Sequence, residues 1–127
     1  MTIFLRTSLY YSIGLVLIFL GGEKMSVEII VKGDVVTAYL GGELDHHTAR
    51  SMREAIDEAV ELNMPTLLVL NFRDIVFMDS SGIGLVMGRY RNLAKSGAEL
   101  LIEDAPPHIF KMLKLAGIEK LAKLKER

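Results

Sequence analysis

An apolar strand-like run that passes through a loop into a helix limits the folds open to this chain. Residues 67–71 form an almost entirely apolar run, as expected of a strand that is covered on both faces. Residues 73–79 have the character of a connecting loop, and residues 85–95 have the apolar spacing of a helix. A further strand-like run follows at 99–103. Strand, helix and strand in this order favour two parallel strands joined by a right-handed crossover, which is the basic unit of an α/β fold.

The segments before this unit extend the same alternation. Two short strands rich in β-branched residues are predicted at 27–31 and 35–40, with the turn signal Gly33-Asp34 between them. A helix is predicted over 48–62, with Asp45 as its N-cap.

After the second crossover strand, a third helix is predicted from 104–107 to Gly117, with Pro107 near its first position. Residues 118–127 fit either a short strand or a short basic helix. The predicted order is therefore β-β-α-β-α-β-α, a single small α/β domain with a mixed sheet and helices packed on it. The residues expected to face the core from the three helices are Ala49, Met52, Ile56, Ala59 and Val60, then Ile83, Val86, Met87, Tyr90, Leu93 and Ala94, then Ile109, Phe110, Leu113 and Ala116.

The composition is that of one globular domain. The chain has 127 residues, of which 50% are hydrophobic and 24% are charged, enough to form a core. A net charge of -1 argues against non-specific nucleic-acid binding, which needs a strongly basic surface. Because the chain contains no cysteine, disulfides, thiolate chemistry and cysteine-ligated zinc are excluded. This composition fits a reducing cytoplasm.

The start of the chain differs from the rest. Residues 8–20 are an almost unbroken apolar run preceded by Arg6, the outline of a signal peptide or a membrane anchor. No small-residue cleavage site follows, and a helix over 7–22 would span only about 24 Å of a hydrocarbon core about 30 Å thick. The codons for the next Gly-Gly-Glu-Lys-Met can spell a bacterial ribosome-binding sequence and a start codon. We therefore expect 1–24 to be an upstream extension from a gene-start error, or else a hydrophobic anchor, and 25–127 to be the domain.

Two adjacent hydroxyl groups stand where the loop turns into the second helix. Ser80 and Ser81 follow Asp79, and a helix N-terminus favours negative charge because its first N–H groups have no partner within the helix. A serine at this place can simply cap the helix. Gly82 and Gly84, however, remove bulk around the turn and allow another protein's active site to approach. The turn is therefore a candidate phosphorylation site, on Ser80 or Ser81.

The glycines also allow other interpretations. Gly82, Gly84 and Gly88 after a strand loosely resemble a dinucleotide-binding loop, with Glu103 placed to contact a ribose. Asp79 would repel a pyrophosphate, and a chain of this length lacks the second half of such a fold. No lysine follows the glycines as in a P-loop, and no glycine stands two residues before either serine as in a nucleophile elbow. Gly84 and Gly88 fit either close contact between helix and sheet or a flat surface for a partner.

The three histidines form a poor metal site. His46 and His47 are adjacent and cannot share a helix face, while His108 begins a distant helix. Asp45, His46 and His47 are either surface and cap residues or part of a docking surface. Because the sequence shows neither a nucleophile–base pair nor a cluster of metal ligands, we expect no enzymatic activity and no cofactor.

Two segments resemble a known family. GELDHHTA at 42–49 and FMDSSGIG at 77–84, followed by Gly-Arg-Tyr at 88–90, are similar to STAS-domain anti-sigma factor antagonists. The similarity is greatest to the antagonists of anti-sigma F in sporulating bacteria, and it covers about residues 25–122. The two segments together, at this separation, are far more specific than the Asp-Ser-Ser-Gly turn alone.

The resemblance implies a small cytoplasmic regulator of transcription without catalytic activity of its own. In this family the first serine of Asp-Ser-Ser-Gly is phosphorylated by the anti-sigma factor, a protein kinase with bound nucleotide, and a serine phosphatase reverses the step. Carried over to this chain, Ser80 is the phosphoacceptor and Asp45 lies near the phosphorylated turn. The unphosphorylated protein binds the anti-sigma factor and releases the sigma factor. The residues expected to contact the partner are Asp45, His46, His47, Asp79, Ser80, Ser81, Gly82 and Gly84.

The family pattern leaves some points open. The N-terminal extension is foreign to the family, and an early end of the chain predicts that the final strand or helix is shortened or absent.

A phosphate adds about -1.5 to -2 charge beside Asp79, so we expect a surface switch that acts by repulsion with little conformational change. Two alternatives remain: a nucleotide-binding STAS domain, and a membrane-tethered regulator if 1–24 are real. For the favoured form we expect no direct contact with nucleic acid or membrane.

Overall fold

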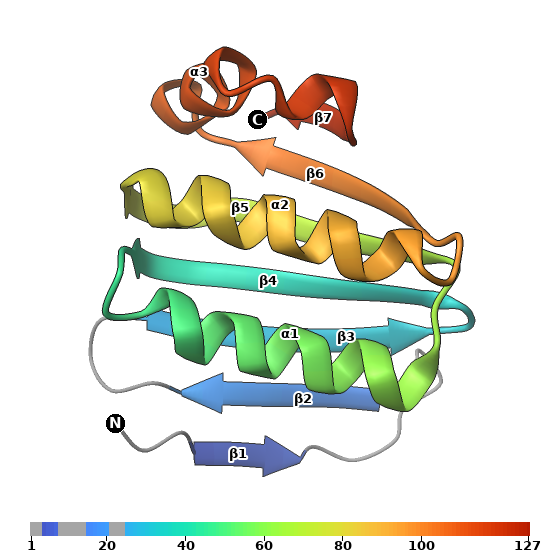
Figure 1. The fold of residues 1–127 in the computed structure, drawn as a ribbon. Coiled ribbons are helices and arrows are strands. Elements are labelled where there is room, and N and C mark those ends of the chain that lie inside the picture. Colours follow the sequence, from blue (N-terminus) through green and yellow to red (C-terminus); the bar gives the residue numbers. More distant parts are fainter. Residues whose placement is uncertain (1–3, 8–14, 21–24) are drawn as a thin grey trace.

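The computed structural model describes residues 4–7, 15–20 and 25–127. Figure 1 shows one twisted sheet with α1 and α2 laid across the same face and α3 at the end of the sheet formed by β6 and β7. The strands lie in the sheet in chain order, from β1 to β7. The elements are β1 (Phe4–Thr7), β2 (Leu15–Leu20), β3 (Met25–Lys32), β4 (Val35–Leu44), α1 (Ala49–Asn63), β5 (Leu67–Met78), α2 (Ser80–Ala94), β6 (Glu99–Ala105), α3 (Pro107–Leu115), the 3-10 helix η1 (Ile118–Lys120) and β7 (Lys123–Glu126).

The sheet is mixed, as the sequence predicts. β3 and β4 form an antiparallel hairpin, and β4, β5, β6 and β7 run parallel to one another. Gly33 sits in the hairpin turn with φ +60°, a conformation that glycine adopts without strain. From β3 to α3 the element order is the predicted β-β-α-β-α-β-α. The fold is therefore a single α/β domain.

The core lies between the sheet and its helices. In β3 every second residue from Met25 to Val31 is buried, and Met52, Ile56 and Ala59 are buried on the inner face of α1, as predicted. Five consecutive residues of β5, 68–72, are buried, in line with the apolar run predicted at 67–71.

The predicted inner faces of α2 and α3 need correction. Arg89 is buried in α2, whereas Ala94 is exposed, because the inner face runs through Leu85, Arg89 and Leu93 and leaves Ala94 outside. Ala116 is also exposed, since α3 ends one residue before it. Ile83, Met87, Tyr90 and Phe110 are only partly buried.

The loop predicted at 73–79 is wrong, because most of this segment belongs to strand β5. β5 continues to Met78, and residues 74–78 pair with 41–44 of β4 through two irregularities in the register. Ile75 and Met78 are buried on this extension. The strand continues because β4 itself continues through its two glycines and supplies a partner. As a result the β5–α2 turn begins directly at the end of a paired strand.

The two ends of the chain add strands to the sheet. β1 pairs with β2, and β2 pairs antiparallel with β3. Residues 8–14 of the N-terminal apolar run lie outside the described residues, so the origin of 1–24 stays a prediction. Within the part of the chain that the structure describes, every helix is too short or too polar to cross a membrane. The ambiguous tail forms both η1 and a short final strand, β7, which pairs with β6.

Candidate functional site

The turn between β5 and α2 is capped by Asp79. Its backbone is extended, and its Oδ1 accepts a hydrogen bond from the Ser81 N–H at 2.8 Å. Its carbonyl oxygen accepts from the Gly82 N–H at 3.0 Å. The helix therefore begins at Ser80, and the capping group is Asp79 instead of either serine. Across the described residues, neither the Ser80 nor the Ser81 hydroxyl takes part in a hydrogen bond.

Ser80 is the accessible serine of the pair. It is exposed, whereas Ser81 is half-buried. The first N–H groups of α2 are less open to an anion than the sequence indicates, because Asp79 already accepts from two of them. A phosphate on Ser80 would thus lie at the positive end of α2 but beside a carboxylate.

The glycines after the serines have different environments. A Cβ at Gly82 would collide with the Met78 side chain and lie 3.2 Å from Leu44 Cδ2. Gly82 therefore lets the first turn of α2 pack on the ends of β4 and β5. A Cβ at Gly84 or Gly88 would meet no atom within 4 Å, so close contact with the sheet is excluded. The smooth surface left by Gly84 and Gly88 fits the second interpretation, a face that admits a partner.

Alanine at the two glycines should have opposite effects on folding. We expect Gly82→Ala to lower the free energy of unfolding by about 1–3 kcal/mol through overpacking against Met78. Gly84→Ala should raise it by up to about 1 kcal/mol, since alanine is the better helix former and the site is open. Urea unfolding followed by circular dichroism measures both, and equal effects would contradict these environments.

A second turn, between β4 and α1, is organised by Asp45. Its Oδ1 accepts hydrogen bonds from the His47 N–H at 2.8 Å and the Thr48 N–H at 3.1 Å. The helix proper starts at Ala49, whose N–H donates to the Asp45 carbonyl at 2.8 Å. The N-cap residue of α1 is thus Thr48 and not Asp45 as predicted, while Asp45 caps the turn that leads into the helix.

Thr48 is a structural residue that the sequence did not single out. It is 1% exposed, its Oγ1 donates to the Glu43 carbonyl at 2.7 Å, and it accepts from the Asp45 N–H at 3.0 Å. Because these bonds hold both sides of the loop, Thr48 fixes the position of Asp45. Its place three residues after an aspartate is the local signal that could have identified it.

The Asp45 carboxylate is stabilised in its charged form. Desolvation raises the pKa of Asp45, but the N–H groups of Thr48 and His47 and the charge of His47 outweigh it, so this pKa lies below its usual value. A lowered pKa adds stability that is present above the unfolded value of about 3.9 and is lost as pH falls through the folded value. The gap in melting temperature between wild type and Asp45→Asn should therefore be largest near neutral pH and shrink below about pH 4. A gap that grows in acid would contradict this.

The two turns lie side by side. Leu44 and Met78 are register partners in the parallel pair β4–β5, and the Asp79 N–H donates to the Leu44 carbonyl at 3.2 Å. Parallel strands bring their carboxyl ends to one edge of the sheet, so the residues that follow, Asp45 and Asp79, are brought together there.

The histidines and two exposed apolar residues complete the description of this region. His46 and His47 are both exposed with ring centroids 3.9 Å apart, and His108 is distant in sequence at the start of α3. Throughout the described part of the chain, no three His, Cys, Asp or Glu side chains gather as a metal site. The end of β5 adds two exposed apolar residues that the sequence missed, Val76 at 70% exposure and Phe77 at 49%. They were missed because they were assigned to a loop.

The chain is similar to known proteins along most of its length. The STAS domain family matches residues 26–127. An anti-sigma F factor antagonist of Paenibacillus polymyxa is 34% identical over 98 residues, which cover 77% of this chain and 84% of the relative. The solved structure of the anti-sigma factor antagonist SpoIIAA in its unphosphorylated form has a TM-score of 0.67 at 31% identity, covering 77% of this chain and 86% of that one. The phosphorylated form of SpoIIAA from Bacillus has a TM-score of 0.62 at 31% identity, covering 77% and 89%.

These similarities agree with the geometry of the two turns. The matched region, 26–127, contains Asp45, Asp79 and both serines. SpoIIAA is known with and without a phosphate, and proteins of this type are regulators and not enzymes. The sequence match, the fold and the SpoIIAA likeness together show that this chain belongs to the STAS-domain anti-sigma factor antagonists.

Proposed function

We propose that this protein is a phosphorylation-controlled switch. In the unphosphorylated form it binds an anti-sigma factor kinase with its nucleotide, and the bound sigma factor is released. The observation that carries the proposal is the state of Ser80, an exposed first residue of α2 whose hydroxyl forms no hydrogen bond to the described residues. Such a hydroxyl is available to attack the γ-phosphate of a kinase-bound ATP.

The contact surface for the kinase is the edge that carries the two turns. It comprises Asp45, His46 and His47 from the first turn and Asp79, Ser80, Ser81, Gly82 and Gly84 from the second. We add Val76 and Phe77, since exposed apolar side chains next to polar groups are typical of protein interfaces. The absence of side chains at Gly84 and Gly88 lets the partner approach α2 closely.

Phosphorylation inactivates the switch through charge. The phosphate would stand beside Asp79, on the same sheet edge as Asp45, and would make this edge strongly acidic. The fold need not rearrange, because Ser80 is already exposed. A serine phosphatase then restores the binding form. We place this cycle in the cytoplasm, carried by the domain at 25–127, without direct contact to nucleic acid or membrane.

The proposal is tested by intact-mass measurement after incubation with ATP and the anti-sigma factor kinase of the same bacterium. Wild type should gain one phosphate, Ser80→Ala none, and Ser81→Ala one. A phosphate on Ser80→Ala but not on Ser81→Ala would move the site to Ser81. No phosphate on wild type, together with no binding to the kinase, would overturn the proposal.

A further inference from the structure

The last two residues of β4 hold the two turns of the candidate site through consecutive carbonyl groups. The Glu43 carbonyl accepts a hydrogen bond from the Thr48 hydroxyl at 2.7 Å, in the turn that leads into α1. The Leu44 carbonyl accepts from the Asp79 N–H at 3.2 Å, in the turn that leads into α2. One strand end therefore fixes both turns, the first through a side chain and the second through the backbone.

The Thr48 hydroxyl also bonds within the first turn. Its Oγ1 accepts a hydrogen bond from the Asp45 N–H at 3.0 Å, while the Thr48 N–H donates to Asp45 Oδ1 at 3.1 Å. Asp45 is thus tied to Thr48 through both its backbone and its carboxylate. Because Thr48 is 1% exposed, removal of the hydroxyl would leave buried polar groups of this turn without their partner.

The residues that Thr48 holds reach the surface, although Thr48 does not. Asp45 is partly exposed, His46 and His47 are exposed, and all three belong to the contact surface proposed above. Thr48 is too deeply buried to touch another protein. Any effect of Thr48 on a partner must therefore pass through the shape of the turn at 45–47.

The turn that carries Ser80 does not depend on this hydroxyl. Asp79 caps α2 with its own carboxylate, which accepts from the Ser81 N–H at 2.8 Å, and the Asp79 N–H uses the Leu44 carbonyl instead of that of Glu43. Loss of the Thr48 hydroxyl would loosen the first turn and leave the serine of the second turn in place. The two turns can therefore be disturbed separately.

We propose that Thr48 is a positioning residue for recognition by the kinase, because its hydroxyl holds the Asp45 turn in the form that the kinase binds. This inference rests on the proposed function. It assigns Thr48 to docking and not to transfer of the phosphoryl group, so loss of the hydroxyl raises the KM for this protein and leaves kcat unchanged. A residue that only stabilised the fold would change neither constant at a temperature where the protein is folded.

The inference is tested by steady-state phosphorylation of the full chain at saturating ATP, with Thr48→Ala compared to Thr48→Ser. Both variants lack the threonine methyl group, and they differ only in the hydroxyl. Thr48→Ala should raise KM about tenfold, the factor that corresponds to the loss of one polar contact, with kcat within about twofold of wild type. Thr48→Ser should restore KM to within about threefold of wild type.

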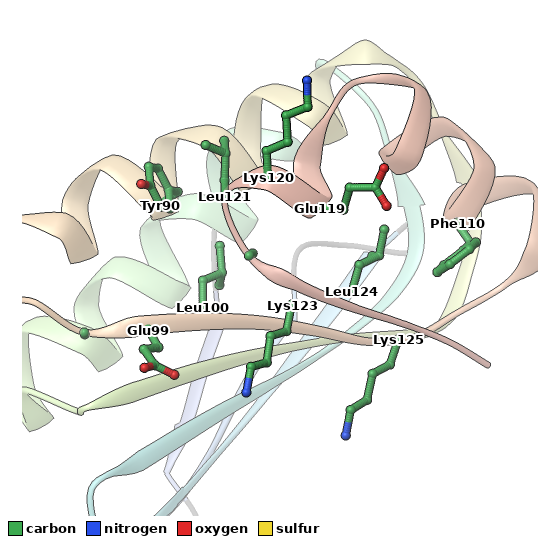
Figure 2. Close-up of a pocket in the computed structure, with 12 residues that line it drawn as sticks. Tyr90, Glu99, Leu100, Phe110, Glu119, Lys120, Leu121, Lys123, Leu124 and Lys125 are labelled. Atoms are coloured by element: carbon green, nitrogen blue, oxygen red, sulfur yellow. The ribbon is translucent and has the colours of Figure 1, made fainter.

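Two control variants lie away from both turns. Thr66→Ala removes another hydroxyl, which donates to Asp34 Oδ2 at 2.7 Å beside the amino end of β5. Leu100→Val shortens a buried side chain, which Figure 2 shows rising from the start of β6 into the groove that Leu121 also lines. Leu100→Val should lower the melting temperature by an amount comparable to Thr48→Ala. Both controls should leave KM within about twofold of wild type.

Equal KM values for Thr48→Ala and Thr48→Ser, with wild type phosphorylated, would overturn this inference and leave the proposed switch standing. A rise in KM shared by Leu100→Val would assign the loss to stability and would also overturn it. A wild type that is neither phosphorylated nor bound by the kinase would overturn both proposals.

A measurement on the wild type decides the matter if Thr48→Ala fails to fold. The N–H groups of Asp45 and Thr48 both donate within the turn, so their amide hydrogens should exchange slowly with solvent. Fast exchange of both amides in the folded wild type would contradict a turn that the hydroxyl holds.

Discussion

An Asp57→Asn variant should have a free energy of unfolding about 3 kcal/mol below that of the wild type. Asp57 on α1 lies with Oδ1 2.8 Å from Nε of Arg89 on α2, and it is the only carboxylate paired with that arginine among the described residues. Arg89 is 5% exposed, and its Nε and Nη1 have no hydrogen bond of acceptable geometry in the described part of the chain. The guanidinium therefore depends on the charge of Asp57.

The physical reason is the cost of an uncompensated buried cation. Burial lowers the pKa of Arg89, the charge of Asp57 opposes this, and nearby Arg53 adds to the lowering. Without Asp57 only the two unfavourable influences remain. Loss of one partner from a fully buried ion pair costs about 3–5 kcal/mol, and the lower end applies here because the Asp57 side chain is 27% exposed.

Three further variants make the test specific. Arg89→Met removes the buried charge and should cost less than Asp57→Asn, and the double variant should resemble Arg89→Met alone. Glu54→Gln breaks the exposed i,i+4 pair with Arg50 and should change stability by less than about 0.5 kcal/mol. Urea unfolding at neutral pH measures all four. Equal losses for Asp57→Asn and Glu54→Gln would show that burial does not govern the Arg89 pair.

The local pattern of apolar residues is enough to predict most of the helices and strands. The helices α1 and α2 and the strands at 27–31 and 99–103 follow from the local spacing of apolar residues, and the strand at 67–71 follows from an almost unbroken apolar run. Neither signal needs knowledge of the rest of the chain. The extension of β5 through 73–78 follows from neither, because its partner is a stretch of β4 distant in sequence that contains two glycines. Because this extension was not predicted, the exposed side chains of Val76 and Phe77 were not recognised as part of the site.

The candidate site was predictable in position but not in detail. The place of Ser80 at a strand-to-helix turn follows from neighbouring residues alone. Asp79 caps the helix, and neither serine hydroxyl forms a hydrogen bond to a described residue. Both facts depend on a side-chain conformation that no sequence pattern specifies. Burial of Arg89 could not be predicted from the sequence either, because its partner Asp57 lies on another helix. The nearness of Asp45 to the turn that holds Ser80 was inferred from the family resemblance, and the parallel β4–β5 register supplies its physical basis.

Under the proposed function, phosphorylated protein should bind the anti-sigma factor kinase about 100-fold more weakly than unphosphorylated protein, and Ser80→Asp about tenfold more weakly. Ser80 is exposed at the edge that carries Asp45 and Asp79, so added negative charge meets two carboxylates and whatever acidic groups the partner presents. Aspartate carries one charge and a phosphate up to about two, which sets the order of the two effects. Surface plasmon resonance with ADP-loaded kinase measures both.

Ser80→Ala and Lys111→Gln separate charge at the site from other causes. Ser80→Ala should bind as wild type and fold with unchanged stability, because its hydroxyl forms no hydrogen bond with a described residue. Lys111→Gln lowers the net charge by the same single unit as Ser80→Asp but on exposed α3, and should bind within twofold of wild type. Since repulsion between exposed charges is screened, the deficit of Ser80→Asp should shrink as salt rises from about 0.1 M to about 1 M. A deficit independent of salt would instead assign the loss to steric fit, and a deficit shared by Lys111→Gln would place the switch outside the Ser80 edge.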